Sequence, residues 1–107
     1  MPENEHPIQE SWSELSSVDK IIHEPARLAV ITILDAVESA DFLYLQRAAG
    51  LTKGNLSVHL GKLEEAGLIE IQKTYQGKIP RTLCKLTMKG KNGFKDYKEQ
   101  MKGVLGK

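Results

Sequence analysis

The chain has 107 residues, of which 40% are hydrophobic and 27% charged, as in ordinary globular domains. No stretch approaches the roughly 18 consecutive apolar residues that a membrane span needs. Glu3, Glu5 and Glu10 stand where a secretory signal peptide would be basic. We therefore expect one domain over residues 1–107, with residues 1–10 loose, in a cytoplasmic protein that has no membrane partner.

The formal net charge of +1 conceals a strong segregation of charge. Residues 1–50 contain three Lys or Arg against nine Asp or Glu, a net charge of −6, whereas residues 51–107 contain twelve against five, a net charge of +7. A basic half of this kind indicates a polyanionic partner for one face.

Residues typical of catalysis or of metal binding are sparse and scattered. The sequence has one cysteine, Cys84, and its histidines, His6, His23 and His59, lack metal-ligand spacing. It also lacks a phosphate-cradling glycine loop, paired carboxylates in a plausible cleft and a nucleophile with a neighbouring base. We therefore expect no metal, no cofactor and no enzymatic activity, and we interpret Cys84 as a buried apolar thiol.

The first two predicted elements are helices. Apolar residues at helical spacing, including Trp12, Leu15 and Ile22, predict an amphipathic helix over residues 11–22. Glu24 and Pro25 then favour the start of a second helix that runs to about Val37, because proline suits the first turn and an acidic group complements the helix dipole.

A helix-turn-helix is predicted next. Residues 39–41 offer capping groups for a helix over residues 42–49, and Gly50 stands where a helix ends in a left-handed residue. Thr52 then caps a helix from Lys53 to about Ala66, whose buried stripe is Leu56, Leu60 and Leu63.

Beyond Gly67 the pattern changes from helical to strand-like. Residues 68–75 alternate, residues 76–80 form a turn, and residues 81–86 return as a second strand of a β-hairpin. A long amphipathic helix follows over residues 88–105. The expected fold class is α+β and mainly α.

Four segments carry a resemblance to a known family. They are Leu51 to Leu60, Leu63 to Ile69, the hairpin segment Gly77 to Thr82, and Leu86 to Gly90. Together they resemble winged helix regulators of the MarR and ArsR type over most of residues 22–97. The resemblance implies a winged helix-turn-helix at residues 43–86, with a three-helix core, a hairpin wing and flanking dimerisation helices. It also implies that the helix over residues 52–66 enters the major groove of DNA, that the wing over residues 73–81 contacts the backbone or minor groove, and that the terminal helices form a homodimer.

The helix over residues 53–66 carries candidate DNA-binding residues on the arc opposite its leucines. This arc presents small or polar residues, namely Gly54, Asn55, Ser57, Val58, Gly61 and Lys62. Two glycines inside a helix cost about 1 kcal/mol each relative to alanine, so we expect a function that offsets this cost. Small side chains allow a helix to approach base edges, asparagine can bond adenine, and valine can contact a thymine methyl group. The alternative is a solvated face without a partner, in which Gly54 is merely tolerated in the first turn, where helix propensity matters less.

Other candidate DNA contacts have alternative roles. Thr52 and Lys53 suit helix capping and also phosphate binding at the helix start, and the two roles are compatible. His59 borders the buried stripe, where it is either a packed or capping group or a contact to phosphate or base. The hairpin residues Lys73, Lys78 and Arg81 suit the DNA backbone or the minor groove, with a solvated hairpin as the alternative.

The flanking helices contain more apolar side chains than a winged core of about 75 residues needs. We expect these residues to form a dimer interface, and they are Trp12, Leu15, Phe94, Tyr97, Met101 and Leu105. A two-fold dimer would place its recognition helices about 34–36 Å apart on a pseudo-palindromic site. The alternative is packing of both ends within one chain.

The sequence therefore predicts a sequence-specific, double-stranded DNA-binding transcriptional regulator, most simply a homodimer. The alternative is a winged-helix module that binds proteins and not DNA. A metal-sensing repressor is disfavoured because the chain lacks the clustered Cys or His of ArsR-like sensors, while a MarR-like pocket for a small-molecule effector stays open.

Overall fold

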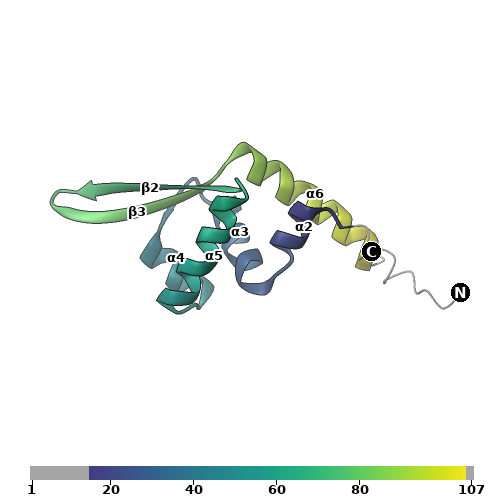
Figure 1. Cartoon of the computed structure of the whole chain (residues 1–107), viewed down its shortest axis with the longest axis horizontal. Coiled ribbons are helices and arrows are strands. Elements are labelled where there is room, and N and C mark those ends of the chain that lie inside the picture. Colours follow the sequence, from purple (N-terminus) through teal and green to yellow (C-terminus); the bar gives the residue numbers. More distant parts are fainter. Residues whose placement is uncertain (1–14, 106–107) are drawn as a thin grey trace, which may run out of the picture.

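The computed structural model describes residues 15–105, apart from the side chain at position 104 (Figure 1). The helices are α2 (Ser17–Ile22), α3 (Pro25–Ala36), α4 (Phe42–Ala49), α5 (Lys53–Glu65) and α6 (Met88–Leu105). The strands are β1 (Ala40–Asp41), β2 (Ile69–Gln76) and β3 (Ile79–Leu86). Within residues 15–105, no helix is both long and apolar enough to cross a membrane.

Side chains that accept hydrogen bonds from backbone N–H groups set where the helices begin. The Glu24 carboxylate accepts from the N–H of Arg27 at the start of α3, the Asp41 carboxylate from the N–H of Tyr44 in α4, and the Thr52 hydroxyl from the N–H of Asn55 in α5. Each cap satisfies a donor that the helix itself leaves unpaired. The predicted starts of these three helices are therefore confirmed.

The first described helix is shorter than the helix predicted over residues 11–22. It begins at Ser17 because Ser16 and Asp19 form a capping box, in which each side chain accepts a hydrogen bond from the backbone of the other. Trp12, the first residue of the predicted dimer interface, lies outside the described residues.

Three antiparallel strands form a sheet in the order β1, β3, β2. The predicted turn over residues 76–80 is tighter than expected, because Gln76 pairs with Ile79 and only two residues form the loop. Gly77 has a φ of 64°, a conformation that suits a two-residue hairpin loop. The short strand β1 was not predicted; its Asp41 pairs with Leu83.

The core lies around α3, between the helix-turn-helix and the base of the hairpin. Its fully buried members come from five elements and from the segment between α5 and β2, and the largest are Ile22, Ile31, Leu34, Leu45, Leu56, Leu63 and Leu68. Figure 1 shows the hairpin extending beyond α4 and α5 as a long arm, while α2 and α6 lie side by side at the opposite end. The core thus presents α5 and the hairpin on one side of the molecule.

The predicted dimer residues divide into two groups. Leu15, Phe94 and Tyr97 are buried within the single chain, with exposed fractions of 7%, 5% and 4%. The reason is that α2 packs along α6, and the Tyr97 hydroxyl lies 2.7 Å from Nδ1 of His23. Met101 is half-buried and Leu105 is 75% exposed. Within the described chain, only the end of α6 therefore keeps free apolar surface from this set.

Candidate nucleic-acid interface

Helix α5 buries one face and exposes the other. Leu56, Leu60 and Leu63 are at most 3% exposed, whereas Val58 on the opposite side is 55% exposed. A Cβ atom built on Gly54 or Gly61 would meet no other atom within 4 Å. Packing within the chain therefore does not require glycine at either position.

The predicted contacts on α5 lie together on this open surface. The exposed residues are Thr52, Lys53, Gly54, Asn55, Ser57, Val58 and Lys62. They span an arc with two flanks: Lys53 and Ser57 lie on the flank toward the hairpin, and Asn55 and Lys62 on the other. The helix thus combines a centre of small side chains with a lysine on either side.

A groove of about 530 Å³ separates α5 from the hairpin. Its polar lining includes Lys53, Ser57 and Arg81, and its apolar lining includes Leu43 and Ile79. Leu43 and Ile79 are 51% and 66% exposed, so the groove offers apolar as well as polar surface. The sequence did not indicate Leu43 as a site residue, because an apolar residue at this position fits the ordinary pattern of an amphipathic helix.

In the hairpin, Lys73 and Lys78 are exposed and Arg81 is half-buried. Nη2 of Arg81 donates to Oδ2 of Asp41 at 2.7 Å, and Nη1 donates to Oε1 of Gln76 at 3.1 Å. The backbone N–H of Tyr44 and the Arg81 guanidinium together hold the pKa of the Asp41 carboxyl below its usual value. Arg81 is therefore fixed over the groove by the same carboxylate that caps α4.

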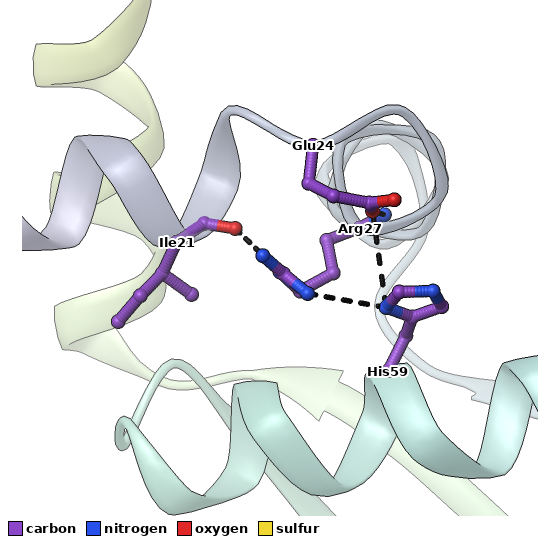
Figure 2. A network of polar contacts seen from close by, with 4 residues as sticks. All are labelled: Ile21, Glu24, Arg27 and His59. Carbon is purple, nitrogen blue, oxygen red and sulfur yellow. Dashed lines mark hydrogen bonds and ion pairs between the residues drawn. The ribbon is translucent and has the colours of Figure 1, made fainter.

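His59 lies at the contact between α5 and the start of α3 (Figure 2). Its Nδ1 is 3.2 Å from Nη1 of Arg27 and 3.8 Å from Oε1 of Glu24. Nε of Arg27 in turn donates to the carbonyl oxygen of Ile21 at 2.6 Å, at the end of α2. The histidine therefore packs against charged partners within the chain, and its contact with DNA stays a prediction. This network was not visible in the sequence.

The described residues do not favour metal or thiol chemistry. Residues 15–105 contain no group of three or more His, Cys, Asp or Glu side chains that could hold a metal ion. Cys84 is 1% exposed, and burial, with smaller effects from Glu64 and Asp41, raises the pKa of its thiol to about 11. The thiol therefore stays protonated and unreactive near neutral pH.

Comparison with known proteins agrees with this geometry. Residues 26–105 match the family model described as a winged helix DNA-binding domain. A protein of Methanocaldococcus jannaschii, described as uncharacterised, is 39% identical over 79 residues, which cover 73% of this chain and 85% of the other.

Two solved structures have the same fold. A transcriptional regulator homologue from Pyrococcus horikoshii OT3 is 28% identical, with a TM-score of 0.79 and 94% of each chain covered. A MarR family putative transcriptional regulator from Porphyromonas gingivalis W83 is 22% identical, with a TM-score of 0.65 and coverage of 98% of this chain and 95% of that one. The predicted winged helix-turn-helix is confirmed, and the chain belongs to the winged helix DNA-binding domain family.

Proposed function

We propose that this protein is a sequence-specific, double-stranded DNA-binding transcriptional regulator that works as a homodimer. Helix α5 enters the major groove, and the wing at residues 73–81 contacts the backbone or the minor groove. The observation that carries the proposal is the exposed face of α5, where two helical glycines have open space around them.

These glycines cost stability that the fold does not recover. Gly61, in the interior of α5, lowers helix stability by about 1 kcal/mol relative to alanine, and Gly54, in the first turn, lowers it by less. Since neither has a neighbouring atom within 4 Å of its would-be Cβ, internal packing cannot offset that cost. Close approach of the helix to another molecule can offset that cost, and the major groove of DNA is wide enough to admit a helix. Asn55, Ser57 and Val58 then present an amide, a hydroxyl and a methyl surface to base edges.

The two flanks of α5 suit the two sugar-phosphate strands beside the groove. On the hairpin side, Lys53, Ser57 and Arg81 line the groove of about 530 Å³. On the other side, Lys62 is exposed near His59. Phosphate contacts of this kind fix the register of a protein on DNA, while base contacts supply specificity. The net charge of +7 on residues 51–107 supports the same orientation.

The homodimer rests on the family resemblance and on the exposed end of α6. Leu105 is 75% exposed, and the half-buried Met101 lies one helical turn before it. Pairing of α6 with its copy would cover both side chains. Two α5 helices would then meet successive major grooves about 34–36 Å apart.

In vitro selection of DNA sequences by the purified protein tests the proposal. We expect enrichment of a motif with two inverted half-sites whose centres lie about 10 base pairs apart. A Gly54→Glu, Gly61→Glu variant is the matched control: its new side chains have room, so it should fold, but they place carboxylates on the proposed interface and should abolish enrichment. Failure of the wild-type protein to enrich any motif would contradict DNA binding and favour a protein-interaction module.

A further inference from the structure

The network around His59 determines which nitrogen of its ring carries a proton. Arginine remains protonated in proteins and has only donors, so a guanidinium 3.2 Å from Nδ1 requires that Nδ1 accept. The hydrogen of the neutral ring must then be on Nε2. Arg27 is itself held by its second hydrogen bond, to the Ile21 carbonyl oxygen. The neutral ring is therefore fixed as one tautomer.

Glu24 provides a partner for the protonated ring. Its Oε1 lies 3.8 Å from the same Nδ1, so a hydrogen on Nδ1 would point toward a carboxylate. The backbone N–H of Arg27 lowers the pKa of the Glu24 carboxyl by more than burial raises it, so Glu24 is ionised near neutral pH. In both protonation states, Nδ1 is occupied within the chain and Nε2 carries a hydrogen.

Nε2 itself faces outward. In Figure 2 it lies on the side of the ring away from Glu24 and Arg27. Among the described residues, no buried side-chain nitrogen or oxygen lacks a hydrogen-bond partner, and the contacts of His59 all involve Nδ1, so Nε2 reaches solvent. On α5, Asn55, His59 and Lys62 have i, i+4, i+7 spacing and share the flank away from the hairpin.

We propose that His59 donates its Nε2 hydrogen to a DNA phosphate, and that Arg27 is a positioning residue that holds the ring in the tautomer that can do so. The acceptor is assigned as phosphate because His59 lies on a flank of α5, beside Lys62, and not at the centre of its exposed face. The inference rests on the proposed DNA-binding function. The junction of α2 and α3 thus takes part in DNA recognition, because Arg27 is bonded both to the Ile21 carbonyl oxygen and to His59 of α5.

Four proteins test the tautomer role: wild type, Arg27→Met, His59→Gln and the double variant. Their affinities for a selected DNA duplex are measured by fluorescence anisotropy. The amide nitrogen of glutamine lies as far along the side chain as Nε2 and donates without a tautomer. We expect His59→Gln to bind within about twofold of wild type. Arg27→Met should bind about 3- to 10-fold more weakly, because the ring loses its fixed orientation as well as its single tautomer, and with them up to the value of one hydrogen bond. In the His59→Gln background, the same Arg27→Met change should lower the DNA affinity by less than about twofold.

Two matched variants separate position and charge. In His59→Asn the amide nitrogen corresponds to Nδ1 and not Nε2, so binding should weaken as in Arg27→Met. Lys102→Met removes one positive charge from an exposed site on α6 and should preserve the wild-type affinity at moderate salt. Nitrogen-15 NMR of the imidazole in the free protein should show the Nε2–H tautomer of His59 in wild type and a mixture in Arg27→Met.

The outcomes distinguish this inference from the proposed function. Equal weakening by Arg27→Met in both backgrounds, or an unchanged tautomer in that variant, would overturn the positioning role while DNA binding stood. Loss of affinity in His59→Gln equal to that in His59→Asn would overturn the Nε2 contact. The absence of wild-type binding to any selected duplex would instead contradict the proposed function.

Discussion

Asn55 and Arg81 are both polar side chains of the proposed interface, but they are held differently. Asn55 is exposed on α5, whereas Arg81 is bound to Asp41 and Gln76. We expect Asn55→Ala mainly to relax sequence preference, by about 1–3 kcal/mol at one base pair. Arg81→Ala should weaken binding to all sequences about equally and flatten the salt dependence, because it removes the proposed phosphate contact. Anisotropy titrations on matched and mismatched duplexes at several salt concentrations measure both effects.

The ion pair of Arg81 makes a control necessary, since Arg81→Ala also frees the wing from α4. Asp41→Asn removes the pair but keeps a side chain that caps helices well. We expect this variant to retain the salt dependence of the wild type, because the guanidinium is still present. If Asp41→Asn flattened the salt dependence as much as Arg81→Ala, the arginine would act by holding the wing and not by contacting phosphate.

At the scale of the element, α5 combines an ordinary buried stripe with a costly exposed face. Gly61→Ala should raise the unfolding free energy by about 1 kcal/mol, since helix propensity improves and the new methyl group meets no atom within 4 Å. For a domain of this size, that gain corresponds to about 4–8 °C in Tm. The same methyl group should weaken DNA binding, because it separates the helix from the base edges. Thermal unfolding followed by circular dichroism and DNA titration measure the two effects on one variant.

Gly103→Ala provides the matched control on another helix. Gly103 lies in α6 and likewise has open space around its would-be Cβ, so the substitution should also stabilise the protein. It should leave the DNA affinity unchanged. A Gly61→Ala variant that gained stability and bound DNA as tightly as wild type would show that the glycine serves no contact, and the small-residue face would lose its significance.

The sequence predicted those elements whose signals are local. The starts of α3, α4 and α5 follow from capping groups and apolar spacing within a few residues, and the structure confirms them. Strand β1 was missed because two residues are too short for any periodicity; it exists only because Ala40 and Asp41 meet Cys84 and Leu83 of a distant strand. The contact of Arg27 with His59 joins residues 32 positions apart and depends on how two helices pack, which no local pattern reports.

At the scale of the whole molecule, the apolar side chains of α6 lie in two environments. Phe94 and Tyr97 complete the core of a single chain. The sequence did not distinguish this role from a dimer contact, because an apolar stripe on a helix has the same spacing whether it packs against its own chain or against a second copy. Toward the end of the helix, Leu105 is free. The basic half of the chain supplies the lysines and the arginine of the proposed DNA surface. It also contains α6, whose exposed end is the proposed association surface, so the two surfaces differ in position and not in which half of the sequence supplies them.

The oligomeric state provides the last test. We expect sedimentation velocity to show a dimer at micromolar concentration, and Leu105→Glu to shift it toward monomer, because the substitution buries a carboxylate in the proposed apolar contact. Met88→Glu is the control on the same helix: Met88 is 70% exposed, close to the 75% of Leu105, but lies at the other end of α6. It should leave the dimer intact. The Leu105→Glu monomer should bind a single half-site much as wild type does and lose the added affinity of a double site. A wild-type monomer at these concentrations would refute the homodimer and leave each chain as an independent reader of one half-site.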